Sequence, residues 1–424
     1  MRLAPPVSHL RLSRVPDLEK YLAFRKQLCT LGLMLAAVTL GTTRVTAQQP
    51  ISRQQAIDAA VNRGARAAVA RADTLVGAAG VISARQWENP SLSLTYSKSV
   101  PTYHEILDIP LDLSGARSAR IGAAQAARLA SVYRFRFERG AAALDADTTY
   151  TRSVAALEHL KLSKRNARDA DSLRRMAIVR RDAGDASELD VLLATVNSGQ
   201  AANSAASDSI TLASTVFDLQ AVMGLDTTLL TVIPGDSLTV PTGDAGFANA
   251  LPLPIASAEQ SLRAAELSVR AQRRGIFAPF SVQAGIEHGD PSQTGILPTF
   301  GVSLPMPLLN RNRGGILQAE AERERARAEL TLAQLETKTA IGRAQRQRNL
   351  ALERVRRDQG LVADANRIVT MSLTAYREGA QGLPAVLEAQ RNAREILGQY
   401  IDDLADAWIA TATLRLYNIP IQEP

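Results

Sequence analysis

Apolar and polar residues alternate with a period of two in four short stretches, which predicts four β-strands. These strands form two pairs, at about 91–113 and about 280–306. Apolar positions on one face and small or polar ones on the other are typical of transmembrane β-barrel strands, and equally of a soluble sheet with one wet face. Six apolar positions are the candidates for a lipid-facing side: Leu92, Leu94, Phe280, Val282, Phe300 and Val302.

Each strand pair is followed by a long segment that lacks proline, from Leu111 to Ile233 and from Leu308 to Leu383. An uninterrupted helix of roughly 65 residues would be on the order of 100 Å long, at about 1.5 Å per residue. Glycine turns near Gly184 and Gly379 would end these helices and return the chain as a second helix. Small and apolar residues in the second segment recur at alternating steps of four and three, which predicts a coiled-coil seam: Ala326, Leu330, Ala333, Thr337, Ala340 and Ala344.

The two strand pairs and their helical hairpins have related sequences. At an offset of 195 residues, Pro110 falls on Pro305, Gly184 on Gly379 and Asn197 on Asn392. The offset holds without a gap, so we predict an internal duplication.

The first residues have the features of a secretory signal peptide. Arg25 and Lys26 precede an apolar run that is too short to span a bilayer comfortably, and Ala47 provides a small residue for cleavage. An uncleaved anchor is the alternative. The predicted organisation is a signal peptide at 1–47; a first repeat at 48–223, with a lead-in helix, a β-hairpin at about 91–113 and a long helical hairpin at about 116–223; a linker at 224–254; and a second repeat at 255–424, with a lead-in helix, a β-hairpin at about 280–306 and a long helical hairpin at about 311–416.

Charge and cysteine content exclude several classes of function. The formal net charge is +7, but residues 1–47 contribute +5 of it, so the mature chain retains only +2. This balance argues against nucleic-acid binding. The only cysteine, Cys29, lies in the predicted signal peptide, which excludes a disulfide framework and a thiolate metal site from the mature chain.

The histidines do not form a catalytic pattern. His9, His104, His159 and His288 are far apart in the sequence, and we expect His104 and His288 in hairpin loops as solvated side chains rather than metal ligands. We therefore predict a protein that is not an enzyme and has neither a cofactor nor a resident metal.

Four motifs resemble the TolC-type outer membrane efflux protein family, and the third is most similar to its heavy-metal, CzcC/CusC-type branch. They are NPSLSL at 89–94, PLDLSGARSARIGAAQAA at 110–127, LPMPLLNRNRGGILQAEAE at 304–322 and YREGAQGLPAVLEAQRN at 376–392.

This resemblance implies a mainly α fold with a small β part, the TolC-like trimeric α/β-barrel. Each protomer of the homotrimer would give four transmembrane strands to one barrel in the lipid of the outer membrane. The coiled-coil helices would form a periplasmic tunnel, in a Gram-negative-type envelope. The implied partners are a periplasmic membrane-fusion adaptor protein and an inner-membrane pump, of the RND type. The alternative is a periplasmic coiled-coil structural or adaptor protein with a soluble sheet.

Three groups of residues are candidate sites within this hypothesis. At the turns between long helices, charged residues would form or gate a periplasmic aperture, although an ordinary solvated helix end is the alternative: Arg181, Asp182, Asp185, Arg377 and Glu378. Gly184 and Gly379 would let the adaptor approach the backbone. The barrel-to-tunnel junctions, with possible roles in bending and in headgroup contact, are marked by Pro110, Gly115, Pro305, Pro307, Asn310, Arg311, Arg313 and Gly314.

Overall fold

The computed structural model describes residues 49–242, 251–276, 280–293 and 295–420. The predicted signal peptide at 1–47 lies outside these residues, as does part of the predicted linker. The described chain is mainly helical with one four-stranded and one two-stranded sheet, so the predicted fold class is confirmed at this level.

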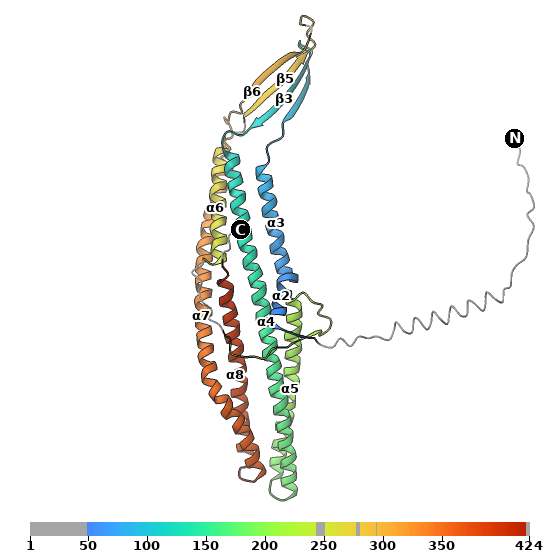
Figure 1. The fold of residues 1–424 in the computed structure, drawn as a ribbon, viewed down its shortest axis with the longest axis vertical. Helices are drawn as coiled ribbons and strands as arrows, with labels where there is room; N and C mark the ends of the chain where they lie inside the picture. The colour runs from blue at the N-terminus through green and yellow to red at the C-terminus, as the bar shows by residue number, and fades with distance from the viewer. Residues whose placement is uncertain (1–48, 243–250, 277–279, 294, 421–424) are drawn as a thin grey trace, which may run out of the picture. The chain divides into compact units, whose positions relative to one another are not determined.

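The four-stranded sheet lies at one end of the described chain, and the turns of the long helical hairpins lie at the other (Figure 1). All neighbouring strands are antiparallel, in the order β2-β3-β5-β6, which leaves β2 and β6 as edges. The strands are β2 (Ser91–Tyr96), β3 (Tyr103–Leu111), β5 (Phe280–His288) and β6 (Leu297–Ser303).

The register of the sheet separates its two faces, because directly opposed residues point to the same side. Leu92 is opposite Leu107, Leu107 is opposite Ala284, and Ala284 is opposite Phe300, which makes one apolar row across all four strands. The other face carries mostly polar or small residues, such as Asp108 and Gln283, together with Ile106 and Leu297. The predicted alternation is therefore present.

Two helices run through most of the length of the described chain (Figure 1). They have 67 and 65 residues and, lacking internal proline, are uninterrupted. Each returns as a helix of 35 residues. All six predicted seam positions of the second long helix are buried or half-buried. These helices are α4 (Ala116–Asp182), α5 (Glu188–Val222), α7 (Arg313–Arg377) and α8 (Leu383–Tyr417).

Two shorter helices, α3 (Ala65–Arg85) and α6 (Leu253–Arg274), lead into the strand pairs. On the sheet side, neighbouring helices pack in the order α3-α4-α6-α7; towards the turns the order is α5-α4-α8-α7. Both arrangements are open layers, since their outermost helices contact one neighbour each. The sheet, with its edges β2 and β6, is open in the same way.

The predicted first lead-in helix is two helices, because α2 (Arg53–Arg63) ends at Gly64. Gly64 has an extended backbone, and a Cβ there would lie 2.3 Å from the carbonyl oxygen of Ala60. Only glycine allows this approach. Next to α2, β1 (Gln49–Ile51) and β4 (Val232–Pro234) form a two-stranded parallel sheet.

Candidate channel surfaces

The apolar face of the four-stranded sheet is exposed in the single chain. Leu94 is 70% exposed, Phe300 80% and Val302 63%, and Leu92 is similar. Val282 is less exposed and Phe280 is half-buried. All six predicted lipid-facing residues thus lie on one face, and no layer of the described chain covers it. A continuous apolar surface of this kind marks a site that contacts lipid or another protein.

His104 and His288 lie in strands β3 and β5, so their predicted placement in hairpin loops is wrong. The Nδ1 atom of His104 is 3.1 Å from Oε1 of Glu287 on the polar face, and Nε2 of His288 is 3.7 Å from Oε1 of Glu105 on the apolar face. The Tyr103 ring stacks on His288 with centroids 4.8 Å apart. Polar residues on both faces interrupt the alternation here, so the sequence pattern does not extend to His104 in β3 or to His288 in β5.

The turns between the long helices share one backbone design. Gly184 and Gly379 have φ values of +87° and +76°, and each donates a backbone hydrogen bond to the carbonyl three residues earlier. Asp185 and Ala380, the following residues, donate to carbonyls five residues earlier. This pattern is the Schellman motif that ends helices at a left-handed glycine.

The predicted aperture charges do not form one cluster in the single chain. Arg181 pairs within its own hairpin, at 2.7 Å from Asp182 and 3.1 Å from Glu188. Asp185, Arg377 and Glu378 are exposed. The turn thus presents both signs of charge to solvent.

Arg180, which sequence reasoning missed, joins the two hairpins near their turns. Its Nη1 atom donates a hydrogen bond of 2.8 Å to the carbonyl oxygen of Tyr376, and its guanidinium lies 4.8 Å from the centre of that ring. Tyr376 is buried in an apolar cluster built from both hairpins, and burial raises the pKa of its hydroxyl. The signal available in the sequence for this contact is Tyr376, an aromatic residue close to a turn in a chain that has few aromatic residues.

The first strand-to-helix junction is closed by polar contacts. Asp112 accepts hydrogen bonds from the backbone N–H groups of Ser114 (3.0 Å) and Arg117 (2.7 Å), and thereby satisfies a free donor at the start of α4. Gly115 has a φ of +74°, and Arg274 of α6 donates to its carbonyl oxygen. Pro110 lies in β3, opposite Ser281.

The second junction is longer and differs in chemistry. Asn312, with a φ of +51°, donates from its side chain to the carbonyl oxygen (3.0 Å) and Oε1 (2.8 Å) of Gln272 in α6. Asn310 accepts a hydrogen bond from the backbone N–H of Asn312. The remaining predicted residues lie at this junction or in the first turn of α7: Pro305, Pro307, Arg311, Arg313 and Gly314.

Comparisons with known proteins show which chains resemble this one. Residues 252–417 match the family model of outer membrane efflux proteins. The chain is 24% identical to the cobalt-zinc-cadmium resistance protein CzcC of Cupriavidus metallidurans, over 86% of this chain and 89% of CzcC. The second half of the chain is thus similar to outer membrane efflux proteins, and the likeness to CzcC extends over most of the chain.

Solved structures share the fold of this chain. A membrane protein from Pseudomonas aeruginosa has 20% identity and a TM-score of 0.74, over 87% of this chain and 90% of that one. The CmeC outer membrane channel of Campylobacter jejuni has 16% identity and a TM-score of 0.73, over 86% of this chain and 85% of that one. The family consists of transporters rather than enzymes.

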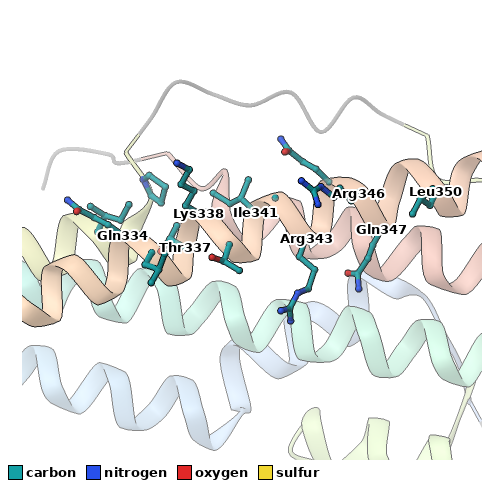
Figure 2. A pocket seen from close by; sticks show the side chains of 14 residues that line it. Gln334, Thr337, Lys338, Ile341, Arg343, Arg346, Gln347 and Leu350 are labelled. Atoms are coloured by element: carbon teal, nitrogen blue, oxygen red, sulfur yellow. The ribbon is translucent and has the colours of Figure 1, made fainter.

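A groove with a volume of about 910 Å³ follows α7 (Figure 2). Its polar side chains include Lys338, Arg343 and Arg346, and its lining contains no carboxylate, histidine or cysteine. It therefore lacks the carboxylate, imidazole and thiolate side chains that usually hold a divalent metal. Nowhere in the described ranges do three or more histidine, cysteine or acidic residues gather as a metal site would require.

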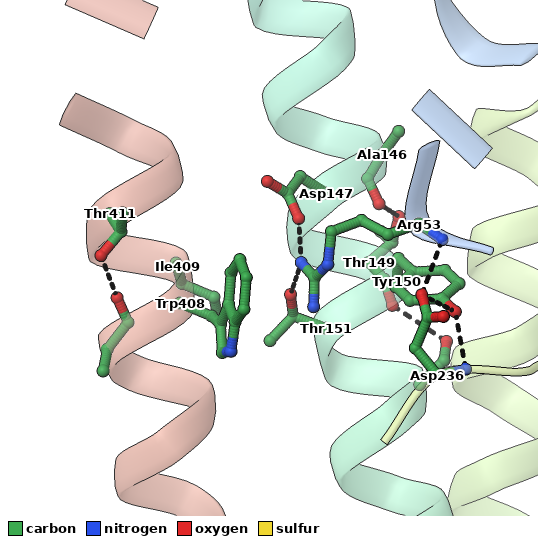
Figure 3. Close-up of polar contacts among 12 residues, drawn as sticks. Arg53, Ala146, Asp147, Thr149, Tyr150, Thr151, Asp236, Trp408, Ile409 and Thr411 are labelled. Atoms are coloured by element: carbon green, nitrogen blue, oxygen red, sulfur yellow. Dashed lines mark hydrogen bonds and ion pairs between the residues drawn. The ribbon is translucent and has the colours of Figure 1, made fainter. Parts of the chain in front are cut away.

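A polar network fixes α2 against the long helices (Figure 3). Arg53 of α2 pairs with the buried Asp147 of α4, and its guanidinium lies 4.1 Å from the ring of Trp408 in α8. The hydroxyl of Tyr150 donates to Asp236 at 2.8 Å, and burial raises the pKa of Tyr150 to about 12. These contacts join segments that are distant in the sequence, so no local sequence pattern could predict them. We assign them a structural role.

Proposed function

We propose that this protein is the outer membrane channel of a tripartite efflux system and forms a homotrimer. The observation that carries the proposal is the four-stranded sheet, which has one exposed apolar face, one polar face and two open edges. Lipid tolerates strands only when a closed barrel satisfies their backbone groups. Four strands are too few for such a barrel, so β2 of one copy would pair with β6 of the next.

The helical layers support the same closure. Exposed apolar residues line both outer helices of the layer next to the sheet, for example Val69 and Val76 of α3 and Leu335 and Leu350 of α7. Although α3 is long and apolar enough to cross a membrane by composition alone, it packs along α4. A head-to-tail contact between α3 of one copy and α7 of the next would close a ring of helices. The protein would thus form a barrel and a tunnel at once.

In this assembly the polar face of the sheet lines water, and the helices reach into the periplasm. At about 1.5 Å per residue, α4 is on the order of 100 Å long. The turns at the far end would form the aperture, where Arg181, Asp182, Asp185, Arg377 and Glu378 would be repeated around the axis. Gly184 and Gly379 would offer backbone to a periplasmic adaptor, which connects an inner-membrane pump of the RND type.

The proposed cargo is heavy-metal cations or drugs, and export is passive. The metal class is suggested by the printed name of CzcC. A channel needs no tight ligands, because cargo must leave as readily as it enters. The sensitivity of a deletion strain to metals and to drugs separates the two classes, and unchanged sensitivity to both would count against efflux.

Two neighbouring substitutions test the membrane role of the sheet. Leu94→Arg puts a charge on the apolar face, where lipid would make it cost about 2–4 kcal/mol near the midplane. Thr95→Arg, the matched control, puts the same charge on the polar face. We expect Leu94→Arg to abolish heat-resistant trimers in outer-membrane fractions and Thr95→Arg to preserve them. Equal, mild effects would favour a periplasmic coiled-coil structural or adaptor protein with a soluble sheet.

A further inference from the structure

The loop between β6 and α7 exposes large apolar side chains directly below the apolar face of the sheet. Leu304, Met306 and Leu308 are each about 70% exposed, and Leu309 is fully exposed. Soluble surfaces rarely carry so many adjacent apolar side chains, and such patches mark contacts with lipid or protein.

The backbone of this loop is restrained, so these side chains are presented in a defined way. Pro305 and Pro307 fix their own φ angles. The backbone N–H of Leu308 donates to the carbonyl oxygen of Met306 at 2.8 Å, which forms a tight turn around Pro307. At the other end, Asn312 is bonded to Gln272 of α6.

The order of residues along the loop follows the layers of a bilayer surface. The alternation of β6 places Phe300 and Val302 on the apolar face, and the same period continues through Leu304 and Met306. The apolar residues end at Asn310, and two exposed arginines, Arg311 and Arg313, follow. No ion pair joins either guanidinium to another residue of the described ranges.

The first junction lacks this combination, so the loop is not a necessary part of joining a strand to a helix. Among residues 112–115, which form that junction, Leu113 is the one large apolar residue, and it is 77% exposed. Arg117 is engaged within the chain, because its guanidinium stacks on Trp87 at 4.1 Å and donates to the carbonyl oxygen of Arg85.

We propose that residues 304–313 anchor each protomer in the periplasmic leaflet of the outer membrane. Leu304, Met306, Leu308 and Leu309 lie among the acyl chains, and Arg311 and Arg313 bind the phosphate groups of phospholipids. This inference rests on the proposed function, since it requires the sheet to span the membrane. Guanidinium groups suit phosphate because they donate paired, charge-assisted hydrogen bonds.

A lipid leaflet explains the loop better than a neighbouring copy does. Although β6 is an edge strand, Leu304 and Met306 continue the period of its apolar face, whereas a neighbouring copy would pair with its backbone edge. The arginines have no carboxylate partner in the described chain, whereas a headgroup layer offers phosphate to every copy. One anchor per protomer, at the second junction alone, follows from the difference between the junctions.

Spin labels at three positions test the proposal in the full chain with Cys29→Ser, reconstituted in phosphatidylethanolamine–phosphatidylglycerol bilayers. The labels replace Leu309 in the loop, Leu94 on the sheet and Leu192 near the helical turns, all of which are exposed. Collisions with oxygen report lipid, and collisions with a water-soluble nickel chelate report water. We expect a lipid signal at Leu94, a shallower lipid signal at Leu309 and a water signal at Leu192.

The other outcomes are distinguishable. A lipid signal at Leu94 with a water signal at Leu309 overturns the anchor and leaves the channel intact. A label at Leu309 that is shielded from both reagents also overturns it, in favour of contact with another copy. A water signal at Leu94 overturns the proposed function and the anchor together.

The arginines are tested in the Leu309-labelled protein by Arg311→Gln with Arg313→Gln, and by the double lysine variant as the charge-conserving control. We expect the glutamine pair to move the label outward and the lysine pair to keep most of its depth. Added inorganic phosphate should change neither. An unchanged depth in the glutamine pair would overturn the role assigned to the arginines.

Discussion

The junction between β3 and α4 takes four residues, 112–115, whereas the junction between β6 and α7 takes nine, 304–312. The short one turns its polar side chains onto the backbone and closes the start of the helix. The long one is bonded to α6 through Asn312 at its end and leaves its apolar side chains uncovered. The two halves share the same order of strands and helices, but the strand-to-helix connections differ in length and in chemistry.

The two halves also differ in how charged residues hold the helices. In the first half, Arg53 pairs with Asp147, whose side chain is 7% exposed, and also donates to Thr151 at 2.8 Å. In the second half, Arg354 of α7 lies 2.8 Å from the buried Asp403 of α8. That approach is not aligned as a hydrogen bond, and Oδ2 of Asp403 has no partner within the described residues. The Arg53–Asp147 pair is therefore better hydrogen-bonded than the Arg354–Asp403 pair.

The largest expected difference in stability between the two halves appears when Arg53 or Arg354 is replaced by alanine. Arg53→Ala leaves the Asp147 carboxylate buried without its partner, which costs about 3–5 kcal/mol. We expect hydrogen exchange of the α2 amides to accelerate strongly. Arg354→Ala is the matched variant and should cost less, since its pair is poorly aligned and Arg354 is 41% exposed.

The loss of stability caused by Arg354→Ala should also depend on pH. Burial raises the pKa of Asp403, so folding favours its protonated form. Stability at this site is therefore fully present below the ordinary pKa of aspartate, near 3.8, and falls as pH rises through the raised value. Arg354→Ala should become more damaging along that rise, and a loss that is largest in acid would contradict this account.

A smaller effect should separate the two junctions. Asp112→Ala removes the acceptor for the backbone N–H of Arg117, and loss of such a cap costs about 1–2 kcal/mol. Asn310→Ala removes an acceptor outside the helix and should cost less. Hydrogen exchange in the first turns of α4 and α7 measures both; equal acceleration in the two turns would show that the junctions do not differ in the way described.

The sequence predicted the elements that have a local cause. The long helices follow from the absence of proline, their ends from Gly184 and Gly379, and the strand faces from period-two alternation. The seam of α7 follows from its four-three spacing, and all of its positions are at least half-buried. These features need only neighbouring residues.

The missed features depend on residues that are distant in the sequence or on a local pattern that is masked. Arg53 and Asp147 meet only because α2 packs on α4, and Arg180 reaches Tyr376 across two hairpins. His104 and His288 were placed in loops because glutamates beside them interrupt the alternation. The exposure of Leu304 to Leu309 required the structure, since the sequence predicts a hairpin that continues to about residue 306, whereas β6 ends at Ser303.

The number of copies in the membrane-extracted protein tests the central claim most directly. The open edges β2 and β6 and the outer helices α3 and α7 would all be closed in a ring of three copies. Light scattering of protein purified in detergent from outer-membrane fractions should therefore give the mass of three chains. A monomer recovered in the soluble fraction would contradict the account.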